Sequence, residues 1–324
     1  MVTRRTFVKG AAVAPIAGVL VLRGGSWARA QNDPIAIGSK DFTEQLILGE
    51  MYAMLLEQAG MTVERKLNLG GTAIAQEALV AGEIDLYPEY TGTGLTAVLG
   101  LEVPSAQAGA TPMATPVATP GTPTTGGIDQ LVYQTVAEGY KTQFNLVWLD
   151  QSPFNNTQAL AVKRTFSEEN NLTTISQMVA MADQLKISAP PDFEERPDGL
   201  VGLKEVYGDF EFGEIIAVAP GIKYQTLLDD QAQVVLAFGT DGQIAGYDLV
   251  LLEDDKGLWP PYHVAPVVRQ ETLDAHPDLA ATLNQVAPLL TDEIMAGLNW
   301  QVDGDEKKEP ADVAQQFLTE QGLL

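Results

Sequence analysis

The sequence contains no cysteine and only two histidines, His263 and His276, and these shortages exclude several chemistries. Without cysteine there are no disulfides, no thiolate nucleophile and no Cys-ligated metal site. Two histidines leave little for a zinc site or for a nucleophile activated by an imidazole base. Most hydrolase mechanisms thus lose their usual base, and we expect a protein that is not an enzyme and has no metal or other cofactor.

Basic residues are also scarce, with 19 Lys and Arg against 43 Asp and Glu and a formal net charge of −24. Such a surface repels the phosphates of nucleic acids, so we expect no nucleic-acid partner. The same charge attracts cations, which favours a small cationic ligand.

Long hydrophobic runs are missing too. The chain has 324 residues, of which 45% are hydrophobic. These values exclude a mainly disordered chain and a polytopic membrane protein, and roughly 150 residues per domain gives about two domains. The apolar run from Ala11 to Leu22 has about 12 residues, fewer than the roughly 20 that a membrane-spanning helix needs.

Residues 1–30 contain five basic and no acidic residues, and they begin with Thr3-Arg4-Arg5-Thr6-Phe7-Val8-Lys9. This pattern is typical of a twin-arginine export signal, and Ala28-Arg29-Ala30 fits a signal-peptidase site. We expect cleavage after Ala30 and a protein that works in the periplasm or elsewhere outside the cytoplasmic membrane. The alternative is an uncleaved segment that holds the protein at the membrane surface.

Strand and helix patterns alternate along the rest of the chain. Asp41 followed by Glu44 suggests a capping box at the start of a helix over 41–58. A second helix is predicted over 73–81, and strands are predicted at 35–38, 63–67, 84–86, 144–148, 158–162, 186–189, 234–238 and 249–252. The order predicts an α/β protein with two lobes, each a mostly parallel sheet with flanking helices, joined by two crossovers around a ligand cleft.

The lobe boundaries follow from the same pattern. Lobe I is expected to comprise residues 31–162 and 256–324, and lobe II residues 163–255. Between residues 104 and 127, 20 of 24 residues are Pro, Thr, Ala or Gly and none is charged. We interpret this segment as an extended solvated insertion in lobe I, either a tolerated surface loop or a spacer that carries O-glycans.

Several ordered motifs resemble one family, the glycine betaine, carnitine and choline substrate-binding proteins of ABC importers. The motifs are Gly38-Ser39-Lys40-Asp41-Phe42-Thr43-Glu44-Gln45, Leu67 to Thr72, Glu83 to Thr93, Phe154-Asn155-Asn156-Thr157, Arg196-Pro197-Asp198-Gly199, Thr240-Asp241-Gly242 and Pro260-Pro261-Tyr262. The resemblance implies a type II periplasmic-binding-protein fold that closes on a small zwitterion or cation. It also implies a monomer that delivers its ligand to a membrane ABC permease.

The chemistry of such a ligand suits aromatic side chains. A quaternary ammonium group has no N–H to donate, so it is best held against ring faces, each worth about 0.5–2 kcal/mol. The resemblance assigns this role to Tyr90, Phe238 and Tyr262. A carboxylate on the same ligand needs donors, preferably a guanidinium fork, and the resemblance assigns Arg196 and Thr93 to it.

One position departs from the family pattern. Gln158 stands where the family commonly has Tyr, so an amide replaces one expected ring. Asn156 and Gln45 are further polar wall residues in this interpretation. The ligand is therefore glycine betaine or a relative, and choline, carnitine or a more polar amine are the alternatives. Two other roles stay open: a ligand-sensing subunit, and a hydrolase using paired carboxylates such as Glu89 and Asp241.

Overall fold

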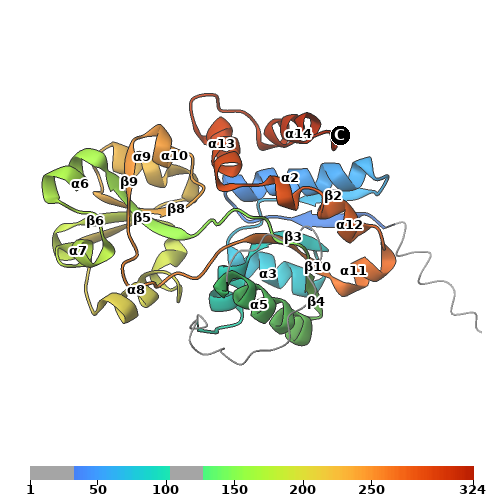
Figure 1. The fold of residues 1–324 in the computed structure, drawn as a ribbon, viewed down its shortest axis with the longest axis horizontal. Helices are drawn as coiled ribbons and strands as arrows, with labels where there is room; N and C mark the ends of the chain where they lie inside the picture. The colour runs from blue at the N-terminus through green and yellow to red at the C-terminus, as the bar shows by residue number, and fades with distance from the viewer. Residues whose placement is uncertain (1–32, 103–126) are drawn as a thin grey trace, which may run out of the picture.

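The computed structural model describes residues 33–102 and 127–324, which form two lobes, each built on a five-stranded sheet (Figure 1). The predicted export signal and nearly all of the insertion at 104–127 lie outside the described residues. Among the helices that the structure describes, none has both the length and the apolar character needed to cross a membrane.

The first lobe contains a mixed sheet with the strand order β2-β1-β3-β10-β4. β10 runs antiparallel to both of its neighbours, while β1, β2 and β3 are parallel. The strands are β1 (Ile35–Gly38), β2 (Val63–Lys66), β3 (Leu86–Tyr90), β4 (Leu146–Trp148) and β10 (Val264–Arg269).

Helices cover both faces of this sheet. One face packs against α2 (Thr43–Gln58), α12 (Leu279–Leu283), α13 (Asp292–Asp303) and α14 (Pro310–Glu320). The other packs against α3 (Thr72–Ala81), η1 (Gly94–Val98) and α5 (Ile128–Phe144). Short helices α4 (Thr91–Thr93) and α11 (Gln270–Ala275) follow β3 and β10.

The second lobe contains a sheet with the order β7-β6-β8-β5-β9, in which β5 is antiparallel to β8 and β9. Its strands are β5 (Gln158–Lys163), β6 (Lys186–Ala189), β7 (Glu214–Ala217), β8 (Val234–Phe238) and β9 (Leu249–Leu252). Its helices are α6 (Arg164–Asn170), α7 (Ile175–Val179), η2 (Ala182–Gln184), η3 (Pro191–Glu194), α8 (Leu200–Tyr207), η4 (Pro220–Ile222), α9 (Lys223–Leu228) and α10 (Gln243–Gly246).

The boundary between the lobes differs from the prediction. The sequence placed residues 158–162 in lobe I, but β5 forms its ladder with β8 and β9, so the second sheet begins at Gln158. Two crossovers, 149–157 and 253–263, join the lobes, and they meet in a bridge between Asn155 and His263. The crossovers therefore bring the ends of β3, β5 and β8 together, where the side chains discussed next are found.

Candidate functional site

A cavity of about 930 Å³ lies between the lobes and is lined by residues from both. Seven of the eight predicted site residues line it: Tyr90, Thr93, Asn156, Gln158, Arg196, Phe238 and Tyr262. The eighth, Gln45, does not. Its amide nitrogen donates to the Pro88 carbonyl at 2.9 Å, and its amide oxygen accepts from the Lys40 backbone N–H at 3.1 Å. Gln45 therefore stabilises the backbone of Lys40 and Pro88 next to the cavity and does not line the cavity itself.

Three aromatic rings from the two lobes form a continuous row. Tyr90 ends β3, and its ring stacks on Phe42 with centroids 6.2 Å apart. On its other side Phe42 is nearly parallel to Phe238 of the second lobe, at 6.3 Å and 9°. The sequence interpretation missed Phe42, although it lies inside the first family motif. This ring fills the space between two predicted cage residues.

Tyr262 forms a separate aromatic wall on the second crossover. Its ring is buried directly over Gly92, where an added Cβ would lie 2.7 Å from the ring. Its hydroxyl donates to Asp198 at 2.9 Å and accepts from the Gln158 amide at 3.4 Å. Gln158 lies opposite Phe238 in the antiparallel ladder, so both side chains share one face of the second sheet. Gln158 therefore hydrogen-bonds to Tyr262 and lies on the same face of the second sheet as Phe238.

Two lysines that were not predicted also line the cavity. Lys40 Nζ lies 2.5 Å from Glu89 Oε1 and 5.3 Å from the Tyr90 ring centroid. Burial lowers the pKa of Lys40 below its usual value, although Glu89 opposes the shift. Lys223 Nζ lies 2.9 Å from Asp241 Oδ2. Glu89 and Asp241, considered above as a hydrolytic pair, are each held by a lysine.

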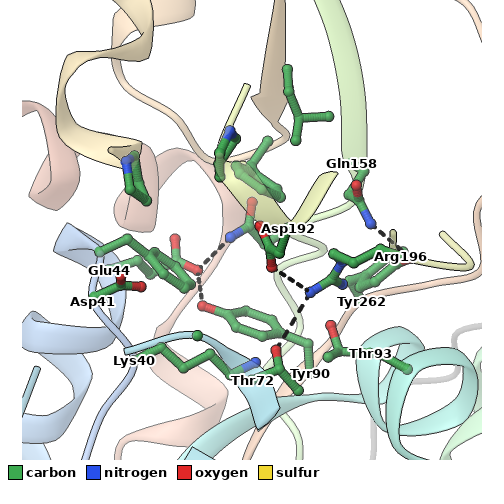
Figure 2. Close-up of a pocket in the computed structure, with 18 of the residues that line it drawn as sticks. Lys40, Asp41, Glu44, Thr72, Tyr90, Thr93, Gln158, Asp192, Arg196 and Tyr262 are labelled. Carbon is green, nitrogen blue, oxygen red and sulfur yellow. Dashed lines mark hydrogen bonds and ion pairs between the residues drawn. The ribbon is translucent and has the colours of Figure 1, made fainter. Parts of the chain in front are cut away.

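Arg196 reaches across the cleft (Figure 2). Its guanidinium grips Asp198 with two hydrogen bonds, 2.8 Å from Nε and 2.7 Å from Nη2. The remaining terminal nitrogen, Nη1, points to Thr72 Oγ1 of the first lobe at 3.5 Å and to Asp192 at 3.6 Å. Asp198 therefore fixes the plane of the guanidinium, and Nη1 stays directed at the opposite lobe.

Further donors gather at the start of α3. Gly71 precedes the helix and supplies no side-chain cap, and the first N–H groups of a helix favour an anion. Gln76 is 8% exposed and lines the cavity, and its Nε2 has no hydrogen-bond partner among the described residues. Buried amides rarely stay unpaired, so this nitrogen marks an unfilled position for an acceptor. The sequence offered no signal for it, because an amide on a predicted helix is usually solvated.

Glu44 turns into the protein rather than capping a helix. The N-cap of α2 is Phe42, which has no side-chain cap, so the predicted Asp41–Glu44 capping box is wrong. The Glu44 carboxylate instead lines the cavity and accepts hydrogen bonds from Tyr90 at 2.7 Å and Asn156 at 2.8 Å (Figure 2). Burial raises its pKa to about 7. These two donors, together with Thr240 and Asn299, explain the inward orientation better than a solvated cap does.

The comparisons with known proteins agree with this architecture. A family model described as the substrate binding domain of an ABC-type glycine betaine transport system matches residues 33–320. The carnitine transport binding protein OpuCC of Listeria monocytogenes is 32% identical, over 91% of this chain and 88% of its own length. A crystal structure of a glycine betaine/carnitine/choline ABC transporter protein has a TM-score of 0.66 and 29% identity, covering 89% of this chain and 99% of the other. The expected two-lobed type II fold is confirmed.

A third relative is described differently. The ergothioneine transport permease/ergothioneine binding protein EgtU of Helicobacter pylori is 31% identical over 94% of this chain. This chain spans only 51% of the length of that relative. The similarity therefore concerns a part of that larger protein.

Proposed function

Because the chain belongs to the family of substrate-binding domains of ABC-type glycine betaine transport systems, we propose that it captures a quaternary ammonium compound in the interlobe cavity and delivers it to a membrane permease. Proteins of this class work outside the cytoplasmic membrane and bind their substrates without transforming them. In this proposal the twin-arginine segment carries the chain to that compartment, and the chain acts as a monomer.

The ammonium end of the ligand is held by ring faces. Phe42, Tyr90 and Tyr262 line the cavity, and each ring face contributes about 0.5–2 kcal/mol to binding a cation. Acidic side chains at the cavity, among them Asp41 and Asp303, add a long-range attraction for cations. The ligand carries no N–H on this end, so hydrogen-bonding groups there would remain unsatisfied.

The carboxylate end is held by polar side chains from both lobes that line the cavity. Arg196 Nη1, already fixed by Asp198, approaches from the second lobe. Lys40, Thr93 and Gln76 approach from the first lobe. The observation that supports the proposal most is that donors from both lobes line this one cavity. A carboxylate placed among them would accept hydrogen bonds from both lobes at once. Binding across both lobes favours the closed form, which the permease then recognises.

Ligand size is the main point of difference among candidates. A drug-sized ligand pocket occupies about 300–1,000 Å³, and this cavity of about 930 Å³ is near the upper end. The space has room for glycine betaine and, together with Gln158 and Gln76, for a larger betaine with polar atoms, such as carnitine or ergothioneine. Choline has no carboxylate and would leave the donors at α3 unpaired.

Calorimetric titration of the chain with glycine betaine, carnitine, ergothioneine and choline tests this assignment. We expect the compounds with a carboxylate to bind at least tenfold more tightly than choline, the equivalent of about 1.4 kcal/mol. Equal affinity for choline would remove the carboxylate subsite from the proposal. Failure of all four compounds would contradict the ligand class itself.

A further inference from the structure

The buried carboxylate of Glu44 joins four separate segments. Its Oε1 accepts hydrogen bonds from the Tyr90 hydroxyl and the Asn156 amide, at 2.7 and 2.8 Å. Its Oε2 accepts from the Asn299 amide at 2.9 Å and from the Thr240 hydroxyl. These donors come from β3, the first crossover, α13 and the loop after β8. All four therefore depend on one side chain that is 2% exposed.

Thr240 is the donor that belongs to the second lobe. The next residue, Asp241, holds Tyr224 and Phe238 of that lobe in place. Its carboxylate accepts hydrogen bonds from the Tyr224 hydroxyl at 2.6 Å and from the Phe238 backbone N–H at 3.0 Å. Glu44 therefore connects the Tyr90 ring of the first lobe to the Phe238 wall of the second. A ligand that contacts both rings depends on this connection.

The arrangement fits an ionised carboxylate. All four partners donate to the ionised carboxylate, so the proton of a neutral Glu44 needs an acceptor. The hydroxyl of Tyr90 or Thr240 can accept it only by turning its own O–H away from Glu44. Asn299 Oδ1 is buried and has no partner among the described residues. If the Asn299 amide rotates by half a turn, Oδ1 takes the place of Nδ2, 2.9 Å from Glu44 Oε2, and gives up the bond of Nδ2 to the Thr240 carbonyl. On each of these routes, protonation turns one of the four donors away from Glu44.

We propose that Glu44 is a positioning residue that couples the ring of Tyr90 to the second lobe, and that its ionised form is the one that binds a ligand with a quaternary ammonium group. The ligand part of this inference rests on the function proposed above. The coupling part rests on the four hydrogen bonds alone, and it can be tested without ligand.

Glu44 titrates near neutral pH mainly because its carboxyl group is buried. Burial raises its pKa to about 7, hydrogen bonds from Thr240, Tyr90 and Asn299 oppose the shift, and Asp241 adds to it. The phenols of Tyr52 and Tyr90 also face Glu44, and burial keeps both neutral by raising their pKa values. The nearby cations Lys40 and Lys223 are paired with Glu89 and Asp241.

The raised pKa of Glu44 gives folding stability and ligand affinity opposite dependences on pH. An ordinary glutamate in the unfolded chain titrates near pH 4.3, so the folded state binds the extra proton between that pH and about 7. The contribution of Glu44 to stability is therefore greatest at low pH and is lost as the pH rises through about 7. The affinity for a cation has the opposite trend, because the ionised form accumulates over the same window.

Titrations with glycine betaine between pH 5.5 and 8.5 compare the wild type with Glu44→Gln. We expect wild-type affinity to fall about tenfold from pH 8 to pH 6, and the affinity of Glu44→Gln to be weak and flat. Glu77→Gln is the matched control, because Glu77 also lines the cavity but is exposed. It removes the same charge and should keep the wild-type slope. Parallel pH profiles for wild type and Glu44→Gln would overturn the proposal.

A ligand-free measurement separates this inference from the proposed function. Carbon-13 NMR of glutamate-labelled protein should show one side-chain carboxyl titrating near pH 7, absent in Glu44→Gln. If Glu44→Gln does not fold, Thr240→Val provides the assignment, since losing one donor should move that titration to higher pH. A Glu44 that titrates near pH 4.5 contradicts the inference. Failure of glycine betaine to bind at any pH, with the NMR titration present, contradicts only the proposed ligand.

Discussion

The ammonium group of Lys223 lies 4.1 Å from the ring centroid of Phe238, a ring that the family motif assigns to the cation of the ligand. Phe42 is stacked on the same ring. The ring of Phe238 is therefore already in contact with Phe42 and Lys223. The ammonium group of Lys223 lies beside a ring that the ligand cation would otherwise contact. The Lys223–Asp241 ion pair therefore sets how strongly the second lobe attracts a quaternary ammonium.

Replacing Lys223 with Met should strengthen glycine betaine binding by about threefold to tenfold. The substitution frees the ring of Phe238 and leaves the charge of Asp241 without its ion-pair partner, and both changes favour a ligand cation. The same variant should melt at a lower temperature, because Asp241 loses that partner. Lys256→Met is the control, since Lys256 lies 5.1 Å over the Tyr207 ring, away from the cavity. Weaker binding by Lys223→Met would show that Lys223 contacts the ligand itself.

Truncating Tyr262 to Ala should weaken glycine betaine binding by about 1–2 kcal/mol, because a cage ring is lost. Tyr262→Phe retains the ring and removes only the hydrogen bonds to Asp198 and Gln158, so its affinity should stay close to wild type. Calorimetry on both variants separates the ring from the hydroxyl. An unchanged affinity in Tyr262→Ala would exclude Tyr262 from the cage.

Substituting Arg196 with Gln should reduce the preference for glycine betaine over choline. The variant loses the donor that points across the cleft to Thr72, and only the carboxylate-bearing ligand needs that donor. We expect at least a tenfold loss for glycine betaine and a smaller loss for choline. Arg164→Gln serves as control, because Arg164 pairs with Asp248 on the surface. Equal losses for both ligands would indicate a purely structural role for Arg196.

Changing Gln158 to Tyr should add the ring that the family pattern contains. Gln158 lies opposite Phe238 and contacts the Tyr262 hydroxyl, so a tyrosine there would face the cavity. Glycine betaine binding should strengthen by about 0.5–2 kcal/mol, while a ligand that needs the amide should bind more weakly. Titrations of Gln158→Tyr with glycine betaine and with a ligand that needs the amide show whether Gln158 selects the ligand. Weaker binding of every compound would mean that the cavity has no room for the tyrosine ring.

Much of the fold could be predicted from local patterns, and the exceptions have identifiable causes. The sequence interpretation did not include β10, whose run contains Pro266, and proline usually argues against a central strand. Here Pro266 lies opposite Pro88 of β3. The predicted strand over 144–148 is shortened to β4 (Leu146–Trp148), because α5 continues through Phe144. Such details depend on tertiary neighbours that periodicity does not reveal.

Site residues were predicted from the sequence only where they lie in or next to a family motif. Seven of the eight predicted residues line the cavity, but Gln45 does not. Phe42, Lys40 and Lys223 were missed because their roles arise from partners far along the chain, such as Glu89 for Lys40. Glu44 was misread because Asp41 and Glu44 have capping-box spacing, and only the fold shows four buried donors around the carboxylate.

The most direct test of the account compares glycine betaine with 3,3-dimethylbutanoate, in which carbon replaces the ammonium nitrogen. The two compounds share their shape and their carboxylate and differ in the cation. If ring faces and nearby acids hold a cation in the interlobe cavity, calorimetry should show glycine betaine binding at least tenfold more tightly, or by about 1.4 kcal/mol. Equal affinity for the two compounds would contradict the central claim that this cavity recognises a quaternary ammonium group.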